Sequence, residues 1–235
     1  MARPFHDRAD AGRVLATKLT AYAHHLQVQV LALPRGGVPV AFEVAQALCV
    51  PLDVFLVRKL GVPGYEELAL GAVATGGVRV LNDEVIQALA ISPEVIETVT
   101  AAEQQELARR ERVYGGERPP LEVRGRILIL VDDGLATGAT MRAAVAALRH
   151  HQPARLIIAV PMAAAETCEV LRAEVDEIIC AVTPQSFYAV GQGYDDFSQT
   201  TDAEVRDLLQ RAGCVQSASR GGNVADMGVS TCNLL

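Results

Sequence analysis

Residues 126–131, with the sequence RILILV, contain five consecutive large apolar side chains. A strand with one face in water alternates apolar and polar residues, whereas this run leaves no polar face. Similar apolar runs occur at 28–34, 52–57, 155–161 and 177–182, and segments with helical spacing occur at 7–22, 38–50, 93–114, 140–150, 163–173 and 202–212. Continuous apolar strands that alternate with helices predict an α/β fold with a central parallel sheet flanked by helices.

The stretch between the second and third strands has a different character. Two short β-rich runs surround Gly76 and Gly77 within residues 71–82, which predicts a hairpin. Ser92 followed by Pro93 is typical of a helix start. Since half of the 235 residues are hydrophobic, one core can organise the chain. We therefore expect a single domain over residues 1–213, followed by a flexible C-terminal tail over 214–235.

The charge and composition of the chain limit its partners. Asp and Glu outnumber Lys and Arg by 28 to 21, whereas a surface for nucleic acid needs clustered Lys and Arg. No apolar run approaches the length of a membrane span, and the five cysteines show neither paired nor metal-like spacing. These features predict a soluble cytoplasmic protein with reduced thiols and with neither a nucleic-acid nor a membrane partner.

The loop after the central apolar run, VDDGLATGAT at 131–140, combines two kinds of ligand group. It follows the carboxyl end of a strand and enters a helix, which is where open parallel sheets bind ligands. Its backbone N–H groups, its hydroxyls and the positive helix end can bind a phosphate; the residues concerned are Ala136, Thr137, Gly138, Ala139 and Thr140. Asp132 and Asp133 would repel a phosphate, but as acceptors they suit two sugar hydroxyls or a hydrated metal ion.

A ligand with a phosphate at one end and a diol nearby is a ribose 5-phosphate. The alternative is a strand that ends in two solvated aspartates before a glycine turn. The stretch LILVDDGLATGATM resembles the phosphoribosyl pyrophosphate (PRPP) motif of type I phosphoribosyltransferases. The resemblance implies that Asp132 and Asp133 hold the ribose 2- and 3-hydroxyls, and that the loop over 136–140 holds the 5-phosphate. It also implies Mg²⁺ as a cofactor, bound by the two aspartates directly or through ribose hydroxyls or water.

A ligand of this kind needs a second anion site for its pyrophosphate, and two segments offer one. In LPRGGVPVA, Arg35 is a fork donor and Gly36 and Gly37 allow close backbone approach, although the same residues could form a structural turn. The adjacent Arg58 and Lys59 are costly to bury unpaired but suit a leaving pyrophosphate. Together with the two aspartates, Arg35, Arg58 and Lys59 form the predicted catalytic set.

The resemblance also implies a lid. Residues 61–77 have the glycines and the weak periodicity of the flexible hairpin that closes over PRPP in this family and excludes water. Glu66 and Glu67 are candidates for contacts within the lid or with the acceptor, or they form a solvated surface pair.

The resemblance implies, in addition, a small hood over the acceptor, built from the N-terminal helix and residues 183–213. Phe187 and Tyr188 are the candidate acceptor-binding residues. With Tyr194 and Phe197, they belong to an aromatic segment in a chain with few aromatic residues. The alternative is that these aromatic side chains close the core.

These motifs occur in the order found in a bacterial branch of phosphoribosyltransferases whose acceptor is undefined, and the resemblance covers about residues 5–210. It implies transfer of the 5-phosphoribosyl group from PRPP to a nitrogenous acceptor such as a nucleobase. Ala136 stands where hypoxanthine-guanine enzymes have an aspartate, which argues against a 6-oxopurine acceptor. A PRPP-sensing regulatory protein without transfer activity would keep the same motifs. Apolar positions expected on the surface of the helix at 93–113 suggest a homodimer.

Overall fold

The structure, a computed structural model, describes residues 4–115, 121–185 and 187–220. Its centre is a five-stranded sheet in the order β2-β1-β6-β7-β8, in which all neighbouring strands are parallel. The strands are β1 (Val28–Ala32), β2 (Leu52–Val54), β6 (Ile127–Val131), β7 (Arg155–Met162) and β8 (Glu177–Val182). This sheet confirms the predicted fold class. Because β1 and β6 are parallel neighbours, the loops that follow them meet at the same edge.

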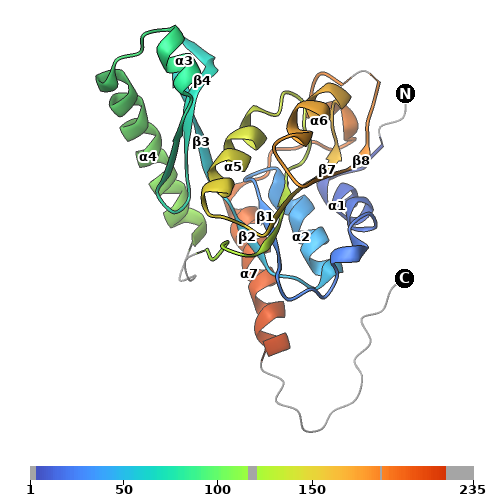
Figure 1. The fold of residues 1–235 in the computed structure, drawn as a ribbon. Helices are drawn as coiled ribbons and strands as arrows, with labels where there is room; N and C mark the ends of the chain where they lie inside the picture. Colours follow the sequence, from blue (N-terminus) through green and yellow to red (C-terminus); the bar gives the residue numbers. More distant parts are fainter. Residues whose placement is uncertain (1–3, 116–120, 186, 221–235) are drawn as a thin grey trace, which may run out of the picture.

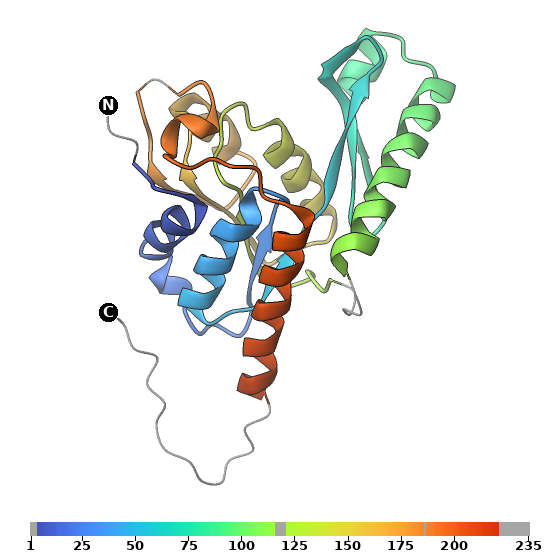
Figure 2. The ribbon, with the colours of Figure 1, turned by 180° about the vertical axis from the view of Figure 1, so that it is seen from behind.

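Helices cover both faces of this sheet (Figures 1 and 2). One layer contains α1 (Arg8–Ala16), α2 (Gly37–Leu48) and α7 (Asp202–Arg220), and the other contains α5 (Ala139–His150) and α6 (Ala165–Arg172). In β6, Ile129 and Val131 pack in the first layer, while Leu128 and Leu130 pack in the second. All four side chains are buried. The unbroken apolar run therefore exists because each face of the strand has its own core.

A second unit, which we call the arm, comprises residues 57–115 and projects from the central sheet (Figure 1). It contains an antiparallel sheet of β3 (Val57–Val62), β4 (Tyr65–Ala74) and β5 (Val78–Leu81), followed by α3 (Asp83–Ala88) and α4 (Pro93–Gly115). The predicted hairpin at Gly76 and Gly77 is confirmed, since both residues have positive φ between β4 and β5. The expected lid is thus part of an antiparallel sheet. The side chains of Glu66 and Glu67 lie outside what the structure describes.

Three boundaries differ from the sequence prediction. The strand predicted at 52–57 ends at Val54. The carbonyl oxygen of Leu56 accepts a hydrogen bond from the N–H of Thr75 over 2.9 Å, and the N–H of Leu56 donates to Oγ1 of Thr75 over 3.0 Å. Leu56 therefore pairs with the end of the arm and does not continue the central strand. The helix predicted at 7–22 ends at Ala16. The sequence predicts a tail from residue 214, but α7 extends to Arg220; residues 221–235 lie outside the described part of the chain.

The prediction of an exposed apolar surface on α4 is also wrong. Its large apolar side chains are buried or half-buried, and four of them belong to or pack against the core that contains α2 and α7. These four are Val99, Leu107, Val113 and Tyr114. Since the helix uses these side chains within the chain, the reason for expecting a homodimer through it disappears.

The N-terminal segment joins the segment before α7, as the expected hood requires. Phe5 forms a bridge with Tyr194 and exchanges backbone hydrogen bonds with Gly193 and Asp195, over 3.1 and 3.0 Å. A short 3₁₀ helix, η2 (Val190–Gly193), precedes this contact. Among residues 4–115, 121–185 and 187–220, no helix has the length and apolar character needed to cross a membrane.

Candidate functional site

The loops after β1 and β6 lie in direct contact at the carboxyl edge of the sheet. A Cβ atom on Gly36 would lie 2.1 Å from Oδ2 of Asp133, and one on Gly37 would lie 2.8 Å from the carbonyl oxygen of Val131. Neither distance is possible for a side chain, so only glycine allows the two loops to approach this closely. The peptide bond between Pro34 and Arg35, at the start of the first loop, is cis. The structure thus brings the PRGG segment against the two aspartates.

Asp132 and Asp133 lie in a partly buried position rather than in solvent. Oδ1 of Asp132 accepts a hydrogen bond from the backbone N–H of Asp133 over 2.9 Å. Burial raises the pKa of Asp132 well above its usual value, and the neighbouring Asp133 carboxylate raises it further. Burial also raises the pKa of Asp133, although the Arg8 guanidinium opposes this effect. The alternative of two solvated aspartates before a turn is therefore wrong.

Arg8, on the first turn of α1, holds the second aspartate. Its Nε donates to Oδ2 of Asp133 over 2.9 Å, and the two side chains are only 11% and 14% exposed. Another guanidinium nitrogen donates to the carbonyl oxygen of Ser198 over 2.7 Å. The guanidinium also lies over the ring of Phe197, 3.9 Å from its centre. Arg8 therefore connects the hood to the acidic pair, although no motif in the sequence indicates it as a site residue.

The loop over 136–140 has the geometry of an anion site at a helix N-terminus. Gly138 has φ of +74° and caps α5 without a side-chain hydrogen bond to the first turn. Thr137, Ala139 and Thr140 are exposed. The backbone N–H groups at the start of α5 thus lie beside solvent and can bind an anion.

Neighbouring elements fix the shape of this loop. Oγ1 of Thr167, on α6, donates to the carbonyl oxygen of Ala136 over 2.5 Å. A Cβ atom on Gly138 would lie 2.7 Å from Cγ2 of the same threonine. Leu135 exchanges backbone hydrogen bonds with Met162 and Ala164 at the end of β7, over 2.9 and 3.0 Å. Thr167 lies in no motif, so the sequence does not indicate it as a site residue.

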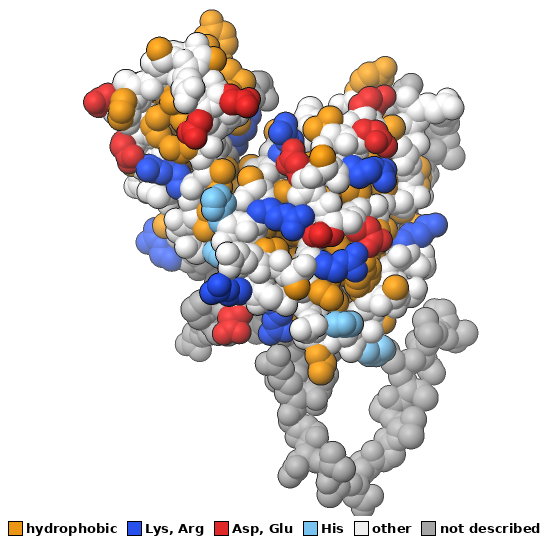
Figure 3. Space-filling view, in the orientation of Figure 1, with side chains coloured by type: hydrophobic (Ala, Val, Ile, Leu, Met, Phe, Trp, Pro, Cys, Tyr) orange, Lys and Arg blue, Asp and Glu red, His pale blue; other side chains and the backbone are white. Residues whose placement is uncertain are grey.

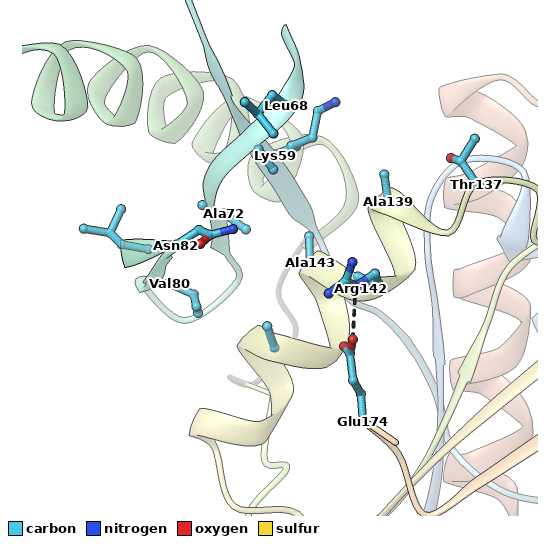
Figure 4. Close-up of a pocket in the computed structure, with 14 residues that line it drawn as sticks. Lys59, Leu68, Ala72, Val80, Asn82, Thr137, Ala139, Arg142, Ala143 and Glu174 are labelled. Atoms are coloured by element: carbon cyan, nitrogen blue, oxygen red, sulfur yellow. Dashed lines mark hydrogen bonds and ion pairs between the residues drawn. The ribbon is translucent and has the colours of Figure 1, made fainter. Parts of the chain in front are cut away.

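Two cavities lie between the arm and the rest of the molecule, which contains the central sheet and its helices. The notch between these two parts is visible in Figure 3. One cavity, of about 690 Å³, is lined by Pro34 and Thr140 from the two loops and by Arg58 and Lys59 from β3. The other, of about 370 Å³, lies between the arm and α5, and Figure 4 shows Lys59 on one side of it and Thr137 and Ala139 near its other side. The arm therefore brings its basic residues to cavities that also contact the loop over 136–140.

The predicted basic residues have acidic neighbours. Nε of Arg58 lies 2.6 Å from Oε2 of Glu103 on α4. A guanidinium nitrogen of Arg35 lies 3.9 Å from Oδ1 of Asp202 at the start of α7. These pairs orient both arginines toward protein carboxylates, so binding of an anion requires the arginine side chains to reorient or to share donors.

The aromatic residues of the hood divide into two groups. Tyr194 is fully buried and its hydroxyl donates to the backbone carbonyl oxygen of Asp133 over 2.5 Å. Phe197 stacks on Tyr194, with ring centres 5.1 Å apart. Tyr194 thus closes the core, whereas Phe197 is 38% exposed. Phe187 is half-buried and packs against the small core cluster that contains Phe5 and Tyr194, whereas Tyr188 is 82% exposed.

Comparison with known proteins identifies the family. A family profile described as the phosphoribosyl transferase domain matches residues 5–196. The chain belongs to the phosphoribosyl transferase family. Two proteins of Mycobacterium tuberculosis, from strains CDC 1551 and H37Rv, are 47% identical over 208 residues, which is 88% of this chain and 47% of each relative. Both are named as phosphoribosyl transferases without a stated acceptor, and this chain spans about half of their length.

A crystal structure shares this phosphoribosyl transferase fold. The protein comes from Thermus thermophilus, is 42% identical, and superposes with a TM-score of 0.77. The similarity covers 88% of this chain and 98% of the Thermus chain. The fold of this chain is therefore similar, over 88% of its length, to one observed in a crystal.

The described acidic residues of this chain do not form a metal site by themselves. Within residues 4–115, 121–185 and 187–220, no group of three His, Cys, Asp or Glu side chains could hold a metal ion. Asp132 and Asp133 supply only two carboxylates, and Arg8 occupies one oxygen of the second. Because Mg²⁺ takes six oxygen ligands, any Mg²⁺ here needs most of them from a substrate or from water.

Proposed function

We propose that this chain transfers the 5-phosphoribosyl group from Mg–PRPP to a nitrogenous acceptor and releases pyrophosphate. The observation that carries the proposal is the contact between Gly36 and Asp133, because it joins two anion-binding loops around a buried acidic pair. Two such loops with acceptor carboxylates beside them suit a ligand with a phosphate at one end, a diol in the middle and a pyrophosphate at the other end. A nucleobase as acceptor and a cytoplasmic location belong to the same proposal.

Each part of PRPP has a proposed partner. The N–H groups and hydroxyls of residues 136–140 bind the 5-phosphate, and Asp132 and Asp133 accept hydrogen bonds from the ribose 2- and 3-hydroxyls. The first loop and the arm bind the pyrophosphate through Arg35, Gly36, Gly37, Arg58 and Lys59. Asp132 and Asp133 would hold Mg²⁺ through ribose hydroxyls or water when PRPP is bound, and the ion would neutralise charge on the pyrophosphate. The substrate would supply most of the oxygen ligands of Mg²⁺, since the described residues do not form a complete metal site.

The reaction needs no covalent intermediate with the protein. An acceptor nitrogen forms a bond to C1 of the ribose while the bond from C1 to the pyrophosphate oxygen breaks, and the electron pair leaves with the pyrophosphate. Positioning by the two loops brings the reactants together, and the basic residues stabilise the charge on the leaving group. Closure of the arm would exclude water, which competes with the acceptor for the same carbon atom.

Release of pyrophosphate from Mg–PRPP tests the proposal, with purines, pyrimidines and simple amines as acceptors. The controls are Asp132→Asn and Asp133→Asn, which keep the side-chain size but remove the negative charge. We expect release that depends on one acceptor and disappears in both variants. If titration calorimetry shows that PRPP binds but no acceptor supports release, the transferase proposal fails and a PRPP sensor explains the site. Absence of PRPP binding would refute both functions.

A further inference from the structure

One face of α4 lines the same cavity as the predicted pyrophosphate ligands. The α4 residues at the cavity of about 690 Å³ recur at intervals of three, four and seven residues, which places them on one face of the helix. They are Thr98, Val99, Ala102, Glu103 and Arg110. Across the cavity lie Pro34, next to Arg35, and Thr140, in the predicted 5-phosphate loop. Helix α4 is thus a wall of the candidate site as well as a support for the arm.

Arg110 is the cation that this face adds to the site. It lines the larger cavity together with Arg58 and Lys59, and it also lines a small cavity of about 20 Å³ beside Pro34, Arg58 and Thr140. Its Nε donates to Oε1 of Glu106 over 2.8 Å. A guanidinium has five N–H donors in a planar fork, so Arg110 can bind a phosphate oxygen while it keeps this contact.

A polar connection fixes α4 against the first loop. Tyr114 lies one helical turn after Arg110, and its hydroxyl donates to Oδ1 of Asp202 over 2.6 Å. The same carboxylate oxygen lies 3.9 Å from a guanidinium nitrogen of Arg35. Arg110 and Arg35 therefore both lie near the Tyr114–Asp202 pair.

We propose that Arg110 binds the pyrophosphate group of PRPP, and so adds a ligand from α4 to those of the first loop and of β3. This inference rests on the proposed function. Its basis is charge and position: Arg58, Lys59 and Arg110 line one cavity, and Glu103 is the only carboxylate among its described lining residues. Such a surface attracts a polyanion, and the planar fork of Arg110 matches two phosphate oxygens.

Arg109 provides a matched control. It pairs with the same glutamate, with its Nε 2.7 Å from Oε2 of Glu106, but it is 51% exposed and does not line the cavity. Arg109→Gln and Arg110→Gln thus remove the same charge from adjacent positions of one helix. Their comparison separates contact with the ligand from a general loss of positive charge.

Titration calorimetry of the full chain in Mg²⁺ buffer tests the inference, with inorganic pyrophosphate and ribose 5-phosphate as the two probes. We expect Arg110→Gln to weaken pyrophosphate binding about tenfold or more, as is typical when a hydrogen bond to a charged group is lost. Binding of ribose 5-phosphate should stay within about twofold of wild type, since this probe lacks the pyrophosphate. Arg109→Gln should leave both affinities unchanged, and Arg110→Lys should show an intermediate loss.

Two results would overturn the inference while the proposed function stands. One is a wild-type affinity for pyrophosphate in Arg110→Gln. The other is an equal loss of affinity for both probes in Arg110→Gln and in Arg110→Lys at unchanged thermal stability, which would indicate an indirect effect on the whole site. If the wild-type chain binds neither pyrophosphate nor PRPP, the proposed function itself is refuted.

Discussion

Arg8 and Asp133 form an ion pair of 2.9 Å although they are 125 residues apart in the sequence. The guanidinium also bonds to Ser198 and lies over the ring of Phe197. One side chain therefore joins three segments: α1, the loop after β6 and the segment before α7. Because the pair is nearly buried, removal of either partner leaves a charge without compensation in a poorly solvated place.

Arg8→Gln should destabilise the protein in a way that depends on pH. At pH 8 we expect the free energy of unfolding to fall by about 3 kcal/mol, as for other broken buried pairs. The Arg8 charge lowers the pKa of Asp133, so in its absence this pKa rises further. Protonation of Asp133 then relieves the unpaired charge, and the difference between variant and wild type should shrink as the pH falls. Urea denaturation at pH 8 and pH 5 measures both values.

Arg13 lies on the same helix and serves as the control for Arg8. It is 57% exposed and has acidic neighbours at 3.6 and 3.8 Å, in Asp10 and Glu43. Exposed pairs contribute little, so Arg13→Gln should change stability by less than about 1 kcal/mol. Equal losses in the two variants would contradict the role given to Arg8.

Asp132→Asn should stabilise the protein at neutral pH while it removes PRPP binding. The pKa of Asp132 is raised in the folded state, so the native protein retains a proton that the unfolded chain has released. The ionised carboxylate therefore costs stability increasingly as the pH rises from the usual Asp range through the raised pKa. Single stabilising substitutions commonly add about 0.5–2 kcal/mol, and we expect a gain in this range.

Urea denaturation of wild type and Asp132→Asn at several pH values checks this sign. The gain should be present at pH 8 and vanish in acid, where the wild-type carboxyl group is protonated. Asp207→Asn is the control, because this aspartate is 63% exposed on α7 and pairs only with Arg211, at 3.3 Å, among its described ion pairs. A loss of stability in Asp132→Asn at pH 8 would show that the ionised carboxylate is well accommodated.

The sequence predicts the central sheet well for a physical reason. Each of the strands β6 and β7 buries both faces, so apolar side chains occur without interruption and the run marks the strand. The same apolar character continues through Phe55 and Leu56, which are buried outside any strand, and the predicted strand at 52–57 is therefore too long. An apolar side chain indicates that a residue is buried, but it does not indicate which strand the residue's backbone pairs with.

The sequence predicts the candidate site only where the site residues lie close together in one motif. Asp132, Asp133 and the loop over 136–140 lie in one motif, and the position of that motif after a strand indicates a ligand site. Arg8 lies in an ordinary helix, and no local pattern indicates a partner 125 residues away. The aromatic residues of the hood lie in an irregular segment without periodicity, so the sequence does not separate the buried Tyr194 from the exposed Tyr188.

Gly138→Ala should disturb the 5-phosphate loop more than its backbone conformation alone explains. An alanine at φ of +74° costs about 1–2 kcal/mol, and here its Cβ would also lie 2.7 Å from Cγ2 of Thr167. Displacement of Thr167 would weaken its hydrogen bond to the carbonyl oxygen of Ala136. We expect affinity for ribose 5-phosphate, measured by calorimetry, to fall about tenfold or more.

Gly125→Ala is the control for Gly138→Ala. Gly125 has a similar φ of +69°, and no described atom lies within 4 Å of its added Cβ position. Both variants should lose stability through the backbone, but only Gly138→Ala should lose affinity. A similar loss of affinity in both would show that general stability, and not the shape of the loop, controls binding.

Tyr188→Ala should separate acceptor binding from PRPP binding. Tyr188 is 82% exposed, so its truncation should change the free energy of unfolding by less than about 0.5 kcal/mol. If the acceptor stacks on this ring, its KM should rise by about fivefold or more, since stacking of a base on an aromatic ring contributes about 1–3 kcal/mol. Steady-state kinetics with the acceptor found in the pyrophosphate-release assay measures this value.

Leu26→Ala is the control for Tyr188→Ala, because Leu26 is 90% exposed and precedes β1 at the opposite, amino edge of the sheet. Truncation there should alter neither KM. In Tyr188→Ala, a higher KM for the acceptor at constant KM for PRPP would place the acceptor against the hood. A rise in the KM for PRPP alone would instead mean that the segment acts through the Asp133 carbonyl oxygen, which accepts the hydrogen bond from Tyr194. Unchanged values for both substrates would remove Tyr188 from the acceptor site and leave the half-buried Phe187 as the candidate.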